Sequence, residues 1–195
     1  MISGAPQPIA DPDVQLLAAI SGTLMGDYIN PEEDPWAGSP FAWIKGRPSR
    51  QMGKVGEQLV AGWSAAKGLD VLRTGDSDAD RVIDGKRVEI KFSTLWVGGG
   101  YTFQQIRNQR YDLCFMLGLS PFTASAWVIP KAVLLEQPFR AGLSHQHGGS
   151  AGTDTIWLRI GADAPPSWLS EYGGTLAKAF ERLSALPPDP PGSLR

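Results

Sequence analysis

Two acidic side chains and a lysine flank a tight turn in the middle of the chain: Asp80, Glu89 and Lys91. The dipeptide Asp84-Gly85 lies between two runs rich in Val and Ile and predicts a β-hairpin, because the turn needs positive φ angles. Side chains alternate between the two faces of a strand, so Glu89 and Lys91 should point the same way. Two carboxylates and an ammonium group at one end of a hairpin can hold a divalent metal ion and orient an attacking water.

The loop before the hairpin offers three acidic residues, Asp76, Asp78 and Asp80. Asp80 adjoins the first strand and can pair with Glu89 across the hairpin, so it is the preferred ligand, with Asp78 as the alternative. The alternating acids could also form a plain polar loop or a calcium loop. An EF-hand loop is excluded, because such a loop requires a glycine at its sixth position and a glutamate at its twelfth, and this sequence has neither there.

The hairpin needs elements that hold it in place, and the sequence predicts a helix before it. Ser49 fits an N-cap and Gly68 a stop. The apolar stripe of this helix consists of Met52, Val55, Leu59, Val60 and Trp63. Val88, Ile90 and Phe92 should face a core on the side of the strand opposite to Glu89 and Lys91.

Residues 101–109 are predicted to form a second helix, because Phe103, Ile106 and Gln109 recur at a spacing of three to four. The glycines at 98–100 before it read as a connector or as a mobile segment over substrate.

The combination of Asp80 with Glu89-Ile90-Lys91 across a hairpin resembles the signature of the PD-(D/E)XK nuclease superfamily, the restriction-endonuclease-like proteins. The resemblance covers roughly residues 53–130. It implies an α/β fold with a restriction-endonuclease-like core, a central mixed β-sheet of about four to six strands flanked by helices. It also implies that Glu57 faces the metal site from the preceding helix; otherwise Glu57 is a solvent-exposed helical glutamate.

The resemblance further implies Mg²⁺-dependent hydrolysis of DNA phosphodiester bonds. One or two Mg²⁺, with Mn²⁺ able to substitute, would be held by Asp80, Glu89 and the Ile90 carbonyl. Lys91 would orient the attacking water and offset charge on the phosphate. Gln104 or Gln105, on the helix after the Glu-x-Lys strand, would position Lys91 or a phosphate.

Restriction-type, sequence-specific cleavage of double-stranded DNA by a homodimer is the expected form of this activity. Repair nucleases, phage nucleases and junction resolvases share the same core. Two other readings remain open, a non-catalytic DNA-binding module and an ordinary α/β domain in which Glu89 and Lys91 form a surface pair.

The distribution of charge bears on DNA binding. Residues 1–34 hold six acidic and no basic residues, whereas residues 41–110 hold twelve Lys and Arg against seven acids. The middle of the chain is therefore a phosphate-facing surface or a solvated face of mixed charge. On the first reading the DNA-contacting residues are Arg47, Arg50, Lys54, Arg107, Asn108, Arg110, His145 and His147.

We expect an acidic N-terminal arm over residues 1–40, a single nuclease-like domain over 41–186 and a disordered, Pro-rich tail over 187–195. The arm contains one candidate helix at 13–25 and could pack on the core, form a dimer contact or shield the basic surface. Later elements are predicted as strands at 70–74, 111–119, 123–129 and 154–160, a short helix after Pro130 and an amphipathic helix at 168–186.

Several classes of protein are excluded by absent signals. The sequence has no apolar run long enough to span a membrane and no secretory signal pattern, and Cys114 is its single cysteine. We therefore expect a cytoplasmic protein in which Cys114 is a buried thiol. It contains no phosphate-binding loop, no dinucleotide-binding glycine motif and no nucleophile elbow. His145 and His147 lack further partners for a zinc site.

Overall fold

The computed structural model describes residues 19–20, 34–75, 77–136, 144–147 and 154–186. The chain divides into two compact units, residues 1–38 and residues 39–195, whose residues contact mainly others of the same unit. In the first unit Ala19 and Ile20 are helical, and Trp36 donates its backbone N–H to the Asp34 carboxylate at 3.0 Å. The remainder of the helix expected at 13–25 and the whole of the tail at 187–195 lie outside the described residues.

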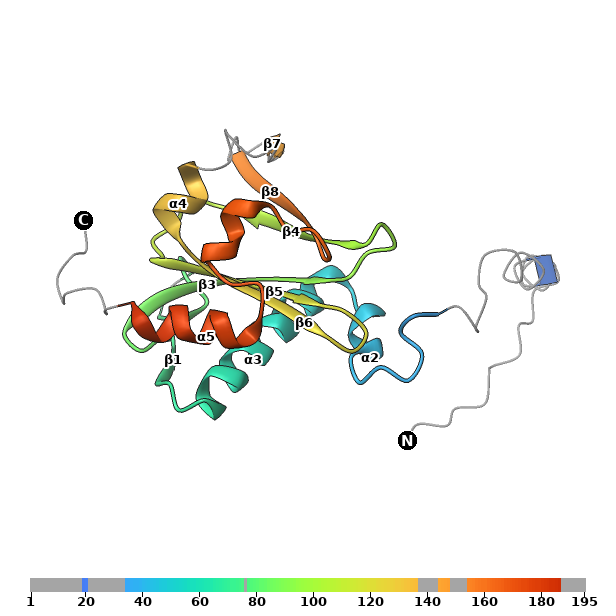
Figure 1. The fold of residues 1–195 in the computed structure, drawn as a ribbon, viewed down its shortest axis with the longest axis horizontal. Helices are drawn as coiled ribbons and strands as arrows, with labels where there is room; N and C mark the ends of the chain where they lie inside the picture. Colours follow the sequence, from blue (N-terminus) through green and yellow to red (C-terminus); the bar gives the residue numbers. More distant parts are fainter. Residues whose placement is uncertain (1–18, 21–33, 76, 137–143, 148–153, 187–195) are drawn as a thin grey trace. The chain divides into compact units, whose positions relative to one another are not determined.

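The second unit is built on a mixed sheet of five strands in the spatial order β1-β2-β3-β5-β6 (Figure 1). β3 and β5 run parallel, and the other neighbouring pairs are antiparallel. The strands are β1 (Val71–Arg73), β2 (Arg81–Ile83), β3 (Lys86–Thr94), β5 (Leu113–Leu119) and β6 (Ala124–Pro130). The expected fold class, an α/β core with a central mixed sheet flanked by helices, is confirmed.

The predicted hairpin joins β2 to β3. Asp84 and Gly85 have φ angles of 47° and 76°, the doubly positive pair that fits the twist of a two-residue hairpin turn. Asp84 also accepts the backbone N–H of Asp70 at 2.7 Å, which ties the start of β1 to the turn. The local sequence therefore determines the register that carries the acidic residues.

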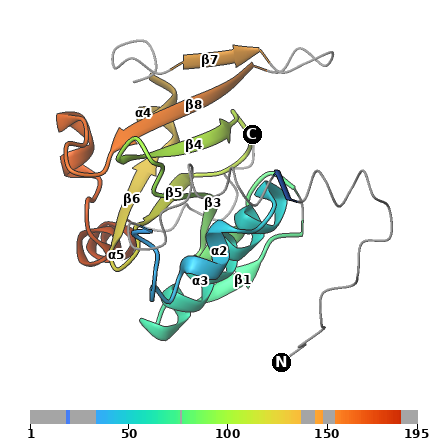
Figure 2. The same cartoon turned by 90° about the vertical axis from the view of Figure 1, so that its right-hand side faces the viewer.

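Two helices cover one face of the central sheet, α3 (Ser49–Ala66) and α5 (Leu176–Ala185) (Figure 2). The apolar stripe of α3 packs there with Val88, Ile90 and Phe92, as predicted. Gly68 follows the helix with a φ of 86° and ends it, also as predicted. The N-cap prediction is wrong: Pro48 takes that position and Ser49 is the first helical residue, because the ring of Pro48 favours the extended conformation that starts the turn.

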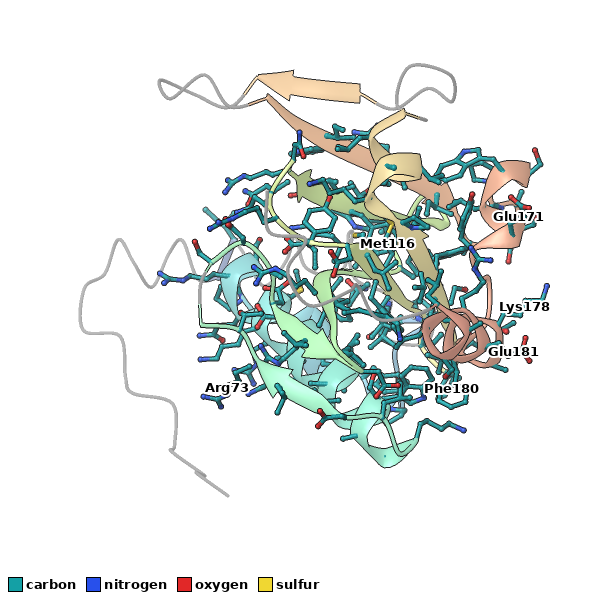
Figure 3. The ribbon with its side chains drawn as sticks, turned by 90° about the vertical axis from the view of Figure 1, so that its left-hand side faces the viewer. Arg73, Met116, Glu171, Lys178, Phe180 and Glu181 are labelled. Carbon is teal, nitrogen blue, oxygen red and sulfur yellow. The ribbon has the colours of Figure 1, made fainter. Side chains whose placement is uncertain are left out.

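The other face is covered by a second, three-stranded antiparallel sheet that the sequence did not predict. Its strands are β4 (Gly100–Ile106), β8 (Asp154–Gly161) and β7 (Ser144–His147), in the order β4-β8-β7. The described residues of this unit also form three short helices, α2 (Ala42–Lys45), α4 (Lys131–Glu136) and a 3-10 helix (Ser167–Glu171). Met116 of β5 points into the apolar layer between the two sheets (Figure 3).

The helix predicted at 101–109 is wrong, because β4 occupies this segment. Tyr101 and Phe103 are buried at strand spacing, and a β-bulge then shifts the register between Phe103 and Ile106. Gln105 within the bulge has a φ of 55°. One extra residue on a strand turns a spacing of two into a spacing of three, which is what a helix shows.

The continuous helix predicted at 168–186 is also wrong. The segment forms a 3-10 turn and then α5, separated by Gly173 and Gly174 with φ angles of 151° and 107°. Gly173 forms a bridge with Trp127 of β6, and a Cβ atom there would lie 2.1 Å from the Ala126 carbonyl oxygen. The close approach of the two backbones breaks the helical pattern.

No helix of the described residues is long and apolar enough to cross a bilayer.

Candidate active site

The outer edge of β3 is where Asp80 meets the strand. β2 pairs with β3 only over Lys86–Val88, and Asp80 extends this pairing by donating its N–H to the Val88 carbonyl at 3.0 Å. The Asp80 carboxylate then accepts the N–H of Ile90 at 2.7 Å. The N–H and C=O of one strand residue point to the same side, so the Ile90 carbonyl faces the side on which Asp80 lies.

Glu89 and Lys91 lie on the face of β3 that points towards the second sheet. The Lys91 Nζ is 2.6 Å from Glu89 Oε1. Glu89 is buried, with 7% of its surface exposed, and it lies opposite Cys114 of β5. Burial raises the pKa of Glu89, and the Asp80 carboxylate raises it further, whereas Lys91 and Arg107 act in the opposite direction. The predicted shared orientation of Glu89 and Lys91 is confirmed by their contact.

Glu57 approaches the same edge from α3, on the opposite face of the sheet. Its Oε2 is 3.5 Å from the Arg81 guanidinium. Burial raises the pKa of Glu57, and Asp80 and Glu89 add to the effect, while Arg81 and Lys54 lower it. Glu57 is therefore within electrostatic range of both other carboxylates and is half-buried rather than solvent-exposed.

The position of α3 depends on a close contact next to Glu57. A Cβ atom on Gly56 would lie 2.3 Å from the Cβ of Phe92, so only glycine lets the helix come this near to β3. Gly56 thus allows the next residue, Glu57, to lie close to β3.

Arg81 is a site residue that sequence reasoning missed. Its NH1 donates to the Asp80 carbonyl at 2.5 Å and lies beside Glu57. A signal was present, because strand alternation places Arg81 on the same face as Ile83, the face that packs against α3. Tyr111 was also missed. Its buried hydroxyl lacks a hydrogen-bond partner among the described residues, and burial, Cys114 and Glu89 raise its pKa.

A second loop is fastened to the loop that carries Asp80. Arg110 Nε contacts the Asp78 carboxylate at 2.5 Å, and Gln109 Nε2 donates to the Ser77 carbonyl at 3.2 Å. Lys131 holds the same loop through a 2.7 Å hydrogen bond to the Gln109 carbonyl. Asp78 thus pairs with Arg110, while Asp80 takes the place beside Ile90; Asp76 lies outside the described residues.

The expected DNA-contacting residues fall into different settings. Arg107 acts on the pKa of Glu89 and Lys54 on that of Glu57, so both lie near the carboxylates. Arg47 lies over the Trp43 ring at 5.9 Å, Arg50 is exposed in the first turn of α3, and Asn108 is exposed after β4. His145 and His147 lie on β7, and their side chains are outside the described part of the structure.

Gln104 and Gln105 do not occupy the place expected of them on a helix. Both lie at the bulge of β4. Within the described part of the chain, neither is hydrogen-bonded to a site carboxylate or to Lys91. Their expected position on a helix beside the site is therefore corrected.

The donor chemistry of the site fits Mg²⁺. No three Asp, Glu, His or Cys side chains of the described residues come close enough together to hold a metal ion. Mg²⁺ does not need three, because it keeps several waters and binds through one or two carboxylates. Asp80 and Glu89 are hard oxygen donors whose charges oppose each other. A cation between them would relieve this repulsion, with the Ile90 carbonyl on the same side.

Among the comparisons with known proteins, only the solved structures give matches. No family model and no curated protein matches the chain. Its fold is similar to that of a bacterial homing endonuclease, with a TM-score of 0.45 and 16% identity over 71% of this chain and 95% of that one. Folds of this general kind carry many functions, so a likeness of this size does not assign one.

Proposed function

We propose that the chain is a Mg²⁺-dependent endonuclease that hydrolyses DNA phosphodiester bonds, with a site of the PD-(D/E)XK type. One observation supports this most strongly. Asp80, Glu89 and Lys91 meet at the edge of β3 that β2 leaves uncovered, with Lys91 2.6 Å from Glu89 and Asp80 2.7 Å from the Ile90 N–H.

The burial of the ion pair argues against a purely structural role. A surface pair would be exposed, whereas Glu89 is 7% exposed and the Lys91 side chain 17%. A buried ion pair is a poor source of stability, because desolvation of the two charges offsets their attraction. Carboxylates with raised pKa values that gather at one place are more typical of catalytic sites.

The residues divide the work as follows. Asp80 and Glu89 would hold the metal, with the Ile90 carbonyl between them, and Glu57 would support them from α3. Bound Mg²⁺ supplies positive charge to the phosphate and makes a coordinated water more acidic. Lys91 would orient that water and offset charge that develops on the phosphate. Arg107 and Lys54 lie near the carboxylates and would contact flanking phosphates.

We further propose that the substrate is double-stranded DNA, cut at specific sequences by a homodimer in the manner of a restriction enzyme. The basic residues of the middle of the chain support DNA as partner. A cut through both strands would require two sites, and therefore a dimer, since one site hydrolyses one strand at a time.

The test is cleavage of plasmid DNA in Mg²⁺ by the wild type, Asp80→Asn and Lys91→Gln. Asp80→Asn keeps the oxygen that accepts the Ile90 N–H, so the fold should survive. We expect each variant to lose about 100-fold or more in rate, as is common when a group that stabilises transition-state charge is removed. Asp84→Asn, in the same hairpin but in the turn, is the matched control and should keep its activity. Full cleavage by both site variants would contradict the proposal.

Cleavage of different DNA substrates in the same assay distinguishes the possible substrate classes. Discrete bands from plasmid DNA would support sequence-specific cutting. Preference for a four-way junction or another branched DNA would instead identify a resolvase or a repair nuclease of the same fold. Metal-independent DNA binding without cleavage of any substrate would identify a non-catalytic module.

A further inference from the structure

We propose that Arg81 is the internal counter-ion of the acidic site, and that its guanidinium competes with the divalent cation for the carboxylates. This inference rests on the proposed function and adds a positioning residue to it. In the metal-free protein Arg81 holds Glu57, and it gives up this ion pair when the cation binds.

The first support is the place of Arg81 in the fold. It is the first residue of β2 and pairs in register with Val88 of β3, directly before the stretch that carries Glu89 and Lys91. Residues that face each other across two strands share one face of the sheet, so Arg81 points towards α3, where Glu57 lies. Only 17% of its side chain is exposed.

The second support is what the guanidinium contacts. NH1 donates to the Asp80 carbonyl at 2.5 Å and lies 3.5 Å from Glu57 Oε2. Arg81 therefore joins the backbone of one site acid to the side chain of another. A longer distance of 3.5 Å to Glu57 describes an ion pair that a stronger cation can displace.

The third support is the balance of charge at the site. Glu57, Asp80 and Glu89 lie within electrostatic range of one another. Glu89 is paired with Lys91 at 2.6 Å, and Glu57 is approached by Arg81 and, from its own helix, by Lys54. An incoming divalent cation meets these positive charges as well as the carboxylates, so each of them lowers its affinity.

Lys91 cannot reveal this competition cleanly, because it is placed in the catalytic machinery. Arg81 can, since its side chain lies on the opposite face of the sheet from Lys91. If Arg81 merely braced the Asp80 loop through the backbone carbonyl, its loss would disorder the site and weaken metal binding. If it competes as a counter-ion, its loss should strengthen metal binding.

The experiment is titration of the full chain with Mn²⁺ alone. Binding is measured by calorimetry or by the electron paramagnetic resonance signal of free Mn²⁺. Arg81→Gln keeps a donor for the Asp80 carbonyl and removes the charge. Arg81→Lys keeps the charge. Arg73→Gln is the matched control, because Arg73 pairs in register with Arg81 on the neighbouring strand but is exposed at the rim of the sheet (Figure 3). Circular dichroism establishes that each variant is folded.

We expect Arg81→Gln to bind Mn²⁺ about 3- to 10-fold more tightly than the wild type, the size expected for removing one nearby charge in a half-exposed site. Arg81→Lys should stay within about 2-fold of the wild type because it keeps the charge. Arg73→Gln should do the same, because the charge of an exposed side chain is largely screened by water and salt.

Equal or weaker binding by Arg81→Gln overturns the role of Arg81 and leaves the proposed function standing, provided that the wild type binds Mn²⁺ and Asp80→Asn does not. Absence of Asp80-dependent Mn²⁺ binding in the wild type overturns both. Tighter binding by Arg73→Gln of the same size as by Arg81→Gln also overturns the inference, because the effect would then belong to net charge and not to this side chain.

Discussion

Glu57 and Glu89 are carboxylates that the folded protein holds in unfavourable surroundings. Each has a raised pKa, for which burial is the largest cause and the other site acids a further one. Lys91 and Arg81 reduce this effect at Glu89 and Glu57 respectively without cancelling it. A carboxylate that costs stability while it is ionised is a suitable ligand for a cation, because a bound cation would offset that cost.

This cost should be visible in the pH dependence of stability. A raised folded-state pKa means that the folded protein binds the proton more tightly than the unfolded chain does. The penalty from Glu57 is then fully present above its folded-state pKa, and it disappears as the pH falls below the unfolded value of about 4.3. With a chelator present, Glu57→Gln should raise Tm by about 1–2 °C at pH 8, and this gain should vanish near pH 4.

The control for this prediction is Glu181→Gln. Glu181 points into solvent from α5 and faces no site acid (Figure 3). Thermal unfolding of both variants across the pH range is the measurement. A gain for Glu57→Gln that persists unchanged at pH 4 would show that its origin is not the ionised carboxylate.

The residues of the site could be predicted only where their geometry is local. Asp80, Glu89 and Lys91 belong to one hairpin, and the Asp84-Gly85 turn fixes its register, so the sequence already states which side chains meet. Glu57 was reached through the resemblance to the nuclease superfamily. Arg81 was overlooked because its role depends on α3 crossing the strand, and Tyr111 because nothing in the sequence shows that its hydroxyl would be buried near Glu89.

At the scale of elements, α3 is the helix whose placement matters most for the site. Gly56 is buried against Phe92, whereas Gly53 and Gly62 in the same helix have open space around the position of a Cβ atom. One helix thus offers both a glycine required by packing and two that are not.

Gly56→Ala should destabilise the protein by about 1–3 kcal/mol, because the added methyl group forces α3 away from β3. The same displacement moves Glu57 from the carboxylates, so cleavage should fall as well. Gly53→Ala is the matched control, and it should stabilise the protein by about 0.5–1 kcal/mol, the difference in helix propensity between the two residues. Denaturant unfolding measures both; equal effects of the two substitutions would contradict the packing argument.

Two elements show why periodicity alone was insufficient. In β4 the bulge at Gln104 and Gln105 inserts one residue between buried Phe103 and Ile106, and the resulting spacing imitates a helix. The segment at 168–186 keeps helical spacing across Gly173, although contact with β6 prevents a helix there. Elements without such interruptions, among them α3, β5 and β6, were predicted within a few residues, because their own burial pattern determines them.

At the scale of the whole molecule, charge is unevenly divided between the two units. Residues 1–38 hold six acidic and no basic residues, so removing them changes the formal net charge from −2 to +4. Negative charge on residues 1–38 repels a polyanion such as DNA and so weakens the attraction that the positively charged second unit exerts on it.

We therefore expect a chain that begins at Ser39 to bind double-stranded DNA about 3- to 10-fold more tightly at low salt, with the gain lost near 0.5 M salt. Binding should be measured in the Asp80→Asn background and without divalent metal ions, so that cleavage does not interfere. The full chain with its six N-terminal acids changed to Asn or Gln is the control and should reproduce the gain. A gain from truncation that the neutral full-length chain does not share would assign the effect to steric blocking.

The edge of β3 also bears on how the protein avoids unwanted strand pairing with other chains. An uncovered strand edge invites another polypeptide to add a strand through backbone hydrogen bonds. Among the described strands none pairs with this edge from Glu89 to Lys91, and Asp80 occupies the Ile90 amide there. We therefore expect the carboxylate that we assign to the metal to protect this strand edge against aggregation as well. Asp80→Ala would remove both functions at once, and insoluble protein from that variant should not be mistaken for evidence about catalysis.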